Sequence, residues 1–105
     1  MAHAIANLDA AGESTRDTAS NPTSFRPGAV DVAINDGGSF SGTIQLRRAF
    51  RKADGSLTDY EAVSGGTWTE ASLPVHEQFE YVPGYHWELY CSARSAGSVN
   101  VMMGN

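Results

Sequence analysis

Residues 40–50, Phe-Ser-Gly-Thr-Ile-Gln-Leu-Arg-Arg-Ala-Phe, decide the fold class of this chain. Successive side chains of an extended strand point to opposite faces. One face of this stretch therefore carries Phe40, Gly42, Ile44, Leu46, Arg48 and Phe50. The other carries Ser41, Thr43, Gln45, Arg47 and Ala49. Aromatic and β-branched residues on one side and polar residues on the other are typical of a strand with one buried face.

The same alternation lies on both sides of this strand. Before it, Val30, Val32 and Ile34 alternate with smaller or polar residues, and residues 35–38, Asn-Asp-Gly-Gly, predict a turn. After it, residues 53–56, Ala-Asp-Gly-Ser, predict a hairpin to a strand over residues 57–63. Further breaks are expected at Gly65-Gly66, Pro74, Pro83-Gly84 and residues 95–98, with strands over 67–69, 75–82, 85–94 and 99–103.

Short strands at this spacing predict an all-β domain over residues 25–105. The architecture expected is an antiparallel β-sandwich or a jelly-roll-like barrel. The predicted core consists of Val32, Ile44, Leu46, Trp87, Leu89 and Val101.

Residues 1–24 differ from the rest of the chain. Ala, Ser, Thr, Asn and Asp dominate, and Ile5 and Leu8 are the large apolar residues apart from the initial Met. Such a segment buries too little to offset its ordering entropy, so we predict an extended or flexible arm that lies on a partner. A short helix over residues 4–11 is the alternative.

The composition excludes several classes of function. The chain has 105 residues, so it is one domain, and its formal net charge of −5 argues against binding to nucleic acid or to an anionic membrane surface. No run of 18 apolar residues is present. The single cysteine, Cys91, excludes an internal disulfide and a cysteine zinc cage. We therefore expect no cofactor.

Catalytic and metal-binding groups do not converge in the sequence. Cys91 and His86 are five positions apart, so they fall on opposite faces of one strand, and Cys91 is expected to be a core residue. His76, Glu80, His86 and Glu88 allow a metal set only if their strands are neighbours, and a solvated polar face is favoured. The carboxylates Asp59, Glu61, Glu77, Glu80 and Glu88 are expected to be solvated as well. We predict that the protein is not an enzyme.

Two groups of residues are candidates for binding. The basic run Arg47, Arg48, Arg51 and Lys52 is either a docking patch for an acidic partner or is paired with Asp59 and Glu61 across the hairpin. The aromatic residues Tyr60, Trp68, Tyr81, Tyr85 and Tyr90 either stack on carbohydrate or pack within the domain.

Residues 38–50, with the Asp54-Gly55 turn and Trp68 that follow, resemble a run found in small virion proteins of tailed bacteriophages. Residues 83–85, 89–91 and 95–101 also resemble the end of such proteins. The chain departs from this pattern at Met102-Met103, where the group has an Arg-Leu pair.

The resemblance implies a capsid decoration (cement) protein, a structural component that binds between subunits of the major capsid protein. It implies a homo-oligomer, a dimer or a trimer, on the capsid exterior of a virion assembled in the host cytoplasm. The expected capsid contacts are Ile5, Leu8, Arg47, Arg48, Arg51 and Lys52. A carbohydrate-binding module of a tail or fibre and a head–tail connector component remain alternatives.

Overall fold

Five strands form one antiparallel sheet with the order β1-β5-β2-β3, and β4 also pairs with β2. The computed structural model describes residues 3–15, 28–80 and 85–104. The strands are β1 (His3–Leu8), β2 (Ala29–Phe50), β3 (Glu61–Thr69), β4 (Val75–Glu80) and β5 (Tyr85–Gly104), with a 3₁₀ turn at Glu70–Ser72. This arrangement confirms the predicted antiparallel all-β class.

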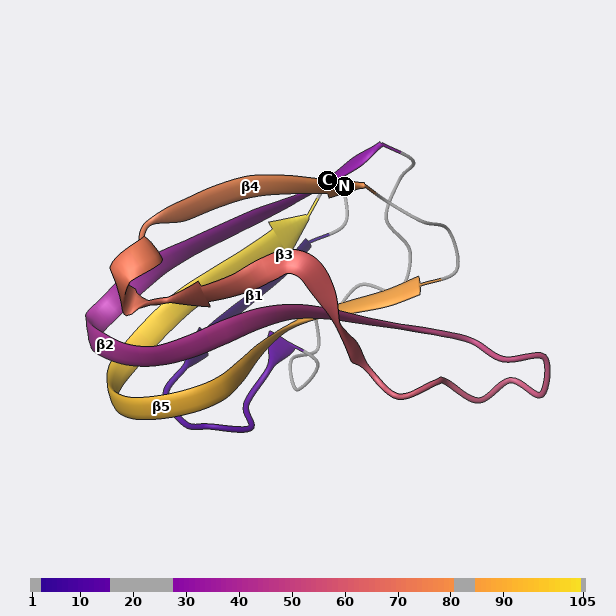
Figure 1. Cartoon of the computed structure of the whole chain (residues 1–105), viewed down its shortest axis with the longest axis horizontal. Helices are drawn as coiled ribbons and strands as arrows, with labels where there is room; N and C mark the ends of the chain where they lie inside the picture. The colour runs from indigo at the N-terminus through magenta and orange to yellow at the C-terminus, as the bar shows by residue number, and fades with distance from the viewer. Residues whose placement is uncertain (1–2, 16–27, 81–84, 105) are drawn as a thin grey trace.

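The two long strands, β2 and β5, organise the sheet. They pair from Asp31 opposite Gly104 to Phe50 opposite Tyr85, and their register shifts between Asp36 and Ile44. At this level both strands turn back together, at the left of Figure 1. The sheet is thereby folded over on itself, and each of the two strands contributes to both halves.

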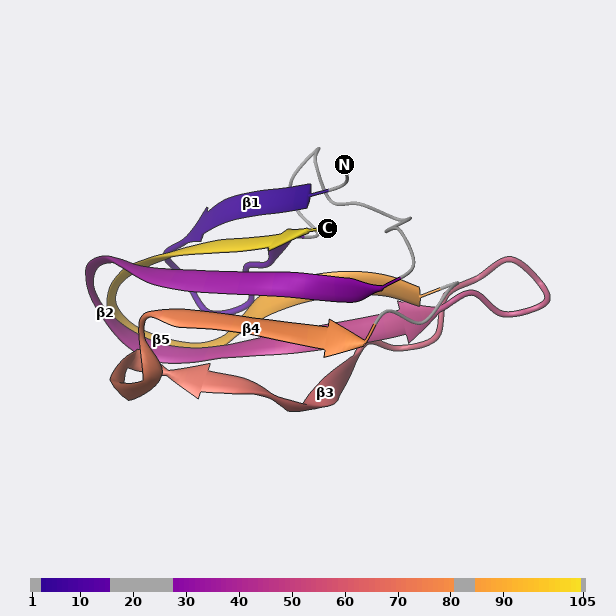
Figure 2. The same ribbon diagram turned by 90° about the horizontal axis from the view of Figure 1, so that it is seen from above.

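Each half of the folded sheet has its own neighbours. The first part of β2 lies between β4 and the last part of β5, with β1 beyond β5 at the margin, as Figure 2 shows. The second part of β2 lies between β3 and the first part of β5. A sheet folded in this way buries its two inner faces against each other.

The predicted turn at residues 35–38 is a bend within β2, and residues 95–98 form the matching bend in β5. The hydrogen-bond partner of β2 on each side of the bend is β5, so no hairpin forms between the two parts of β2. Gly97 has φ +71°, and a Cβ there would collide with the carbonyl oxygens of Gly38 and Ser39. The glycine is required because the two bends approach each other this closely.

The hairpin expected at residues 53–56 is present, and it projects from the body of the molecule (Figure 1). Its strand begins later than expected, at Glu61. Gly65-Gly66 is a register irregularity inside β3, where Gly65 has φ +78° and β2 shifts register between Gln45 and Arg47. A bulge of this kind needs the same residues as a strand break. The turn expected at Pro83-Gly84 lies outside the described residues.

The core is one cluster between the two inner faces, and Trp87 is its largest fully buried side chain. All six predicted core residues belong to it and are at most 1% exposed. They are accompanied by Ala4, Leu8, Val30, Ile34, Phe40, Trp68, Val75, Cys91, Val99 and Met103.

The expectation of an arm over residues 1–24 needs correction for residues 3–15. His3–Leu8 is strand β1, paired in register with residues 99–104 of β5, so the alternative helix over residues 4–11 is wrong too. Ala4 and Leu8 are 0% and 2% exposed, respectively. The alternation of Ala4, Ala6 and Leu8 with Ile5 and Asn7 has period two, but small alanines weaken its apolar signal. The rest of the expected arm, residues 16–24, lies outside the described residues.

Candidate functional site

A pocket of about 210 Å³ lies at the end of the inner face of the sheet, beyond the last fully buried residues of the core. Along β2 the exposed fraction of the inward-facing side chains rises from 0% at Leu46 to 47% at Phe50. Arg48 lies between them. The pocket is lined by the end of β2, the start of β5 and the first part of the hairpin strand: Arg48, Phe50, Thr58, Asp59, Glu61, Ala62, Val63, Ser64 and Tyr85.

Two aromatic rings in edge-to-face contact, those of Phe50 and Tyr85, form one wall of this pocket. The ring centroids of Phe50 and Tyr85 are 5.7 Å apart, with an angle of 81° between the ring planes. Tyr85 in turn lies 6.3 Å from Trp87, the buried end of the series. Edge-to-face contacts of this kind fix the orientation of each ring. The wall is therefore rigid although Phe50 is half exposed.

The guanidinium of Arg48 lies over this wall. Its Cζ atom is 4.7 Å from the ring centroid of Tyr85 and 5.4 Å from that of Trp87, within the range of a cation–π interaction. Within residues 3–15, 28–80 and 85–104, Arg48 makes no side-chain hydrogen bond or ion pair. Its N–H donors therefore face the pocket without a protein acceptor in this part of the chain.

Two carboxylates also line the pocket. Glu61 is the cross-strand partner of Arg48 at the start of β3, and Asp59 precedes it in the hairpin. Both residues are exposed. Of the two carboxylates that the sequence places across the hairpin from the basic run, Glu61 lies opposite Arg48 in register and Asp59 precedes the strand. The ion pair that forms nearby involves another carboxylate.

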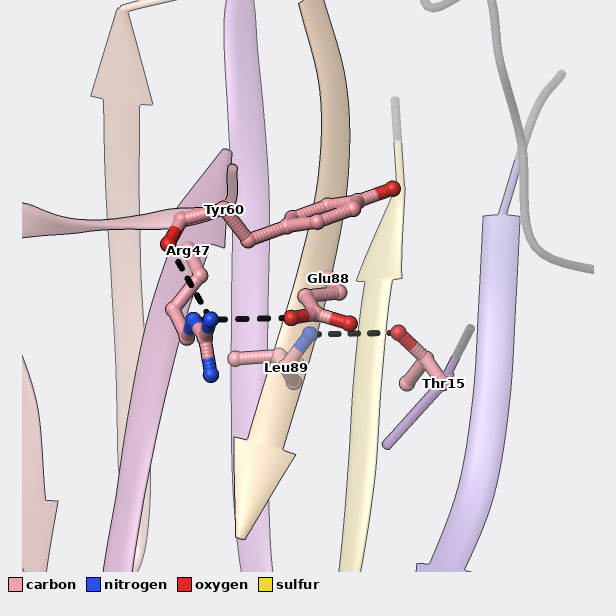
Figure 3. A network of polar contacts seen from close by, with 5 residues as sticks. All are labelled: Thr15, Arg47, Tyr60, Glu88 and Leu89. Carbon is pink, nitrogen blue, oxygen red and sulfur yellow. Dashed lines mark hydrogen bonds and ion pairs between the residues drawn. The ribbon is translucent and has the colours of Figure 1, made fainter. Parts of the chain in front are cut away.

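That carboxylate is Glu88, which lies on the outer face and is nonetheless fully buried. Arg47 is its cross-strand partner, with Arg47 Nε 3.5 Å from Glu88 Oε1, and Arg47 also donates from Nη2 to the carbonyl oxygen of Tyr60 at 3.0 Å (Figure 3). The Arg47 guanidinium carbon lies 4.3 Å from the ring centroid of Tyr90. The expectation of a solvated Glu88 is therefore wrong.

The segment after β1 lies along the edge of β5 next to Glu88. Gly12 donates to the carbonyl oxygen of Cys91 at 2.8 Å, and the backbone N–H of Cys91 donates to the carbonyl oxygen of Glu13 at 2.9 Å. The buried hydroxyl of Thr15 accepts a hydrogen bond from the backbone N–H of Leu89 at 3.1 Å (Figure 3). Strand alternation cannot reveal this neighbour, which comes from the far end of the sequence.

The basic run does not form a single patch. Arg47 and Arg48 point to opposite faces of the sheet, and both are engaged within the protein. Arg51 donates to the carbonyl oxygen of Gly55 at 2.6 Å and lies 3.3 Å from Nε2 of His86. Lys52 is exposed in the hairpin. Only the end of the run, Arg51 and Lys52, is placed where a partner can reach it.

The histidines and carboxylates considered for metal binding are separated by the fold. His76 and Glu80 are on β4, which pairs with the first part of β2, whereas His86 and Glu88 are on the first part of β5. Among the described residues, no group of three His, Cys, Asp or Glu side chains is arranged to hold a metal ion. Burial, and then the charge of Arg51, lowers the pKa of His86.

The other nucleophile candidate, Cys91, is a fully buried free thiol in the core, and burial raises its pKa. The remaining aromatic candidates divide. Trp68 is 6% exposed and packs edge-to-face on Phe79 with ring centroids 5.9 Å apart. Tyr60 and Tyr90 belong to the network around Arg47, and Tyr81 lies outside the described residues. Only Tyr85 lines the pocket.

A second surface lies on the outer face of β1 and β5. Ile5 and Met102 are cross-strand partners, and they are 54% and 41% exposed. Together with Phe50 they are the exposed large apolar side chains in the described part of the chain. Leu8, expected as a contact residue beside Ile5, is instead buried in the core. Met102 was not singled out by sequence pattern, because its partner across the sheet comes from β1.

Asparagines lie next to this apolar pair. Asn7, Asn100 and Asn35 follow one another across β1, β5 and β2, and Asn7 Nδ2 donates to Asn100 Oδ1 at 2.9 Å. Ala33 continues the row of Ile5 and Met102 onto β2. Ile5, Met102, Ala33 and these three asparagines form a patch of apolar and amide side chains on this face, and Asp31 of β2 lies at its border.

No helix in the described residues is long and apolar enough to cross a membrane. Comparison of the chain with protein-family models, with curated proteins and with solved structures gives no match.

Proposed function

We propose that this protein is a non-enzymatic structural protein of a bacteriophage virion, a capsid decoration protein that binds the major capsid protein. The observation that carries the proposal is the cross-strand pair Ile5 and Met102, both exposed on the outer face. We call the patch that they form with Ala33, Asn7, Asn35 and Asn100 the attachment face. Contiguous exposed apolar residues with a polar surround are typical of protein contact surfaces. The resemblance of residues 38–50 to virion proteins supplies the identity of the partner.

The composition of the attachment face supports attachment to protein rather than to a charged polymer. The centres of protein interfaces are depleted of charged residues, and amide side chains supply their hydrogen bonds. The backbone under the face is held in register by β1, β5 and β2. A rigid face binds without paying for the ordering of a loop.

The expected contacts are revised accordingly. Ile5 remains a contact residue, and Met102 joins it, while Leu8, Arg47 and Arg48 serve the fold. Of the basic run, Arg51 and Lys52 remain as contacts. Their positive charges attract the protein to acidic surface on the capsid, and salt screens this attraction.

We also propose that the protein decorates the capsid as a homo-oligomer, a dimer or a trimer. Within the described ranges, β1, β3 and β4 each pair with one strand only, so an edge of each is open. An open edge of a sheet is a template for pairing with another copy.

The test is a binding assay with capsids that lack the protein. The double variant Ile5→Ser/Met102→Ser should bind at least about tenfold more weakly, since burial of each apolar side chain contributes about 1.5–3 kcal/mol. Phe50→Ser is the matched control, because it removes a similarly exposed apolar side chain from a different face. Equal decoration by the double variant and the wild type, counted as copies per capsid, refutes the proposal.

A further inference from the structure

The pocket beside Phe50 is not used by capsid attachment through the outer face, and its chemistry is of a different kind. It combines an aromatic wall, a guanidinium without a protein acceptor in the described residues, and two exposed carboxylates. Each of these features restricts the ligand that the pocket can hold.

The size of the pocket restricts the ligand to one small ring. Sites for drug-sized molecules and cofactors measure about 300–1,000 Å³. The volume of about 210 Å³ is below this range. A nucleotide or a dinucleotide does not fit, whereas a six-membered ring with its substituents does.

The aromatic wall restricts the faces of the ligand. Phe50 is 47% exposed, and its ring contacts Tyr85 edge-to-face. Exposed rings held in this way offer an apolar platform at little further cost in side-chain entropy. A ligand with an apolar face gains from covering Phe50.

The polar groups restrict the edges of the ligand. Arg48 only donates hydrogen bonds, and ionised Asp59 and Glu61 only accept them. The three side chains sum to a net charge of −1, which disfavours an anion. A cationic donor would satisfy Asp59 and Glu61 but would leave the N–H groups of Arg48 without an acceptor. A neutral ligand with several hydroxyl groups satisfies both kinds of partner, because a hydroxyl both donates and accepts.

The geometry points to a carbohydrate-binding site: a neutral pyranose ring stacked on Phe50, with its hydroxyl groups accepting hydrogen bonds from Arg48 and donating them to Asp59 and Glu61. The ring belongs to the terminal residue of a neutral glycan, because the pocket has room for one ring. Arg48 is held in place by Tyr85 and Trp87, so the donor is oriented before the ligand arrives.

The experiment is a titration of the isotopically labelled full chain with methyl glycosides of glucose, galactose, mannose and N-acetylglucosamine, followed by NMR. At least one glycoside should shift the signals of Phe50, Glu61 and Tyr85 with a dissociation constant of about 1 mM, the weak range expected for one small ring. Sodium acetate and guanidinium chloride serve as charged probes. Failure of all four glycosides to shift these signals at about 20 mM overturns the proposal, as does a shift by a charged probe alone.

Variants assign the binding to the pocket. Phe50→Ala should weaken glycoside binding at least about tenfold, and Glu61→Gln, which keeps the shape of the side chain, about threefold or more. Glu77→Gln on β4, exposed and outside the pocket, should bind like the wild type. Wild-type affinity in both pocket variants overturns the proposal. The variant Ile5→Ser/Met102→Ser should keep glycoside binding, so failure of capsid attachment and failure of this site are told apart.

Discussion

Arg47 on β2 and Glu88 on β5 are cross-strand partners that form an ion pair, with Glu88 0% exposed and Arg47 22% exposed. The pair therefore joins the central strands of the sheet at a point that solvent reaches only from the arginine side. Removal of a charge from water is costly, and the Arg47 guanidinium offsets part of that cost for the buried carboxylate of Glu88.

Arg47→Met should destabilise the protein by about 3–5 kcal/mol, since it leaves a buried carboxylate without its nearest cation. Glu88→Gln should cost less, about 1–3 kcal/mol, because the Arg47 guanidinium is partly exposed to water and still donates to the carbonyl oxygen of Tyr60. Urea denaturation at neutral pH gives both values. A cost below about 1 kcal/mol for Arg47→Met would mean that the pair behaves like an exposed one.

Asp36 links the bend of β2 to acid stability. Backbone hydrogen bonds from Phe40 and then Gly38 to its carboxylate, at 3.0 and 2.8 Å, lower its pKa from 3.8. A carboxyl whose folded pKa is lowered contributes stability above its unfolded pKa and loses that contribution as the pH falls through the folded value. Asp36→Asn should therefore be less stable than the wild type at pH 7, and the gap should close below about pH 3.8. A gap that stays constant in urea titrations from pH 6 to pH 2 contradicts this assignment.

Gly97 should be the glycine of the bend that tolerates substitution least. Gly97→Ala places a Cβ against the carbonyl oxygens of Gly38 and Ser39 at φ +71°. Gly55→Ala is the matched control, since Gly55 has φ +90° but no heavy atom within 4 Å of the added Cβ. The control should cost about 1–2 kcal/mol for the backbone conformation alone, and Gly97→Ala clearly more. Equal unfolding midpoints for Gly97→Ala and Gly55→Ala, in heat or in urea, would show that the two bends move apart to admit the Cβ without a loss of stability.

Strand β1 should behave as part of the core. Leu8→Ala is expected to destabilise the protein by about 2–4 kcal/mol, because Leu8 is 2% exposed. Ile5→Ala, three positions away on the outer face, should change stability by less than about 1 kcal/mol, because Ile5 is 54% exposed. A change of less than about 1 kcal/mol for Leu8→Ala as well, measured by urea denaturation, would restore the picture of an unattached arm.

Four residues of the candidate pocket are candidates already in the sequence, but their meeting is not visible there, and Phe50 is assigned only to the apolar face of its strand. Tyr85 is one of the aromatic candidates, Arg48 belongs to the basic run, and Asp59 and Glu61 are among the carboxylates. Their convergence depends on the pairing of β2 with both β3 and β5. The register of strands distant in sequence is set by the whole core, so no local pattern predicts it.

The sequence by itself determined which side of each strand is buried. Alternation with period two is a local property, because the geometry of an extended chain turns every second side chain to the same face. Residues such as Ile44 and Trp87 therefore fall in the core whichever strand lies beside them. The antiparallel class followed from the same local information, together with the spacing of the turn residues.

The tertiary structure decided which strands are neighbours. Residues 35–38 favour positive φ, and a backbone of this kind is compatible with either a hairpin or a bend within one strand. A bend forms because β2 pairs with β5 both before and after these residues. Alternation correctly placed Glu88 on the outer face, but it did not predict that this side chain is buried there beside Arg47. Strand pairing and burial have the same physical cause. Both depend on every part of the chain that comes near a residue, and contacts such as the hydrogen bond between Leu89 and Thr15 leave no trace in the residues next to either partner.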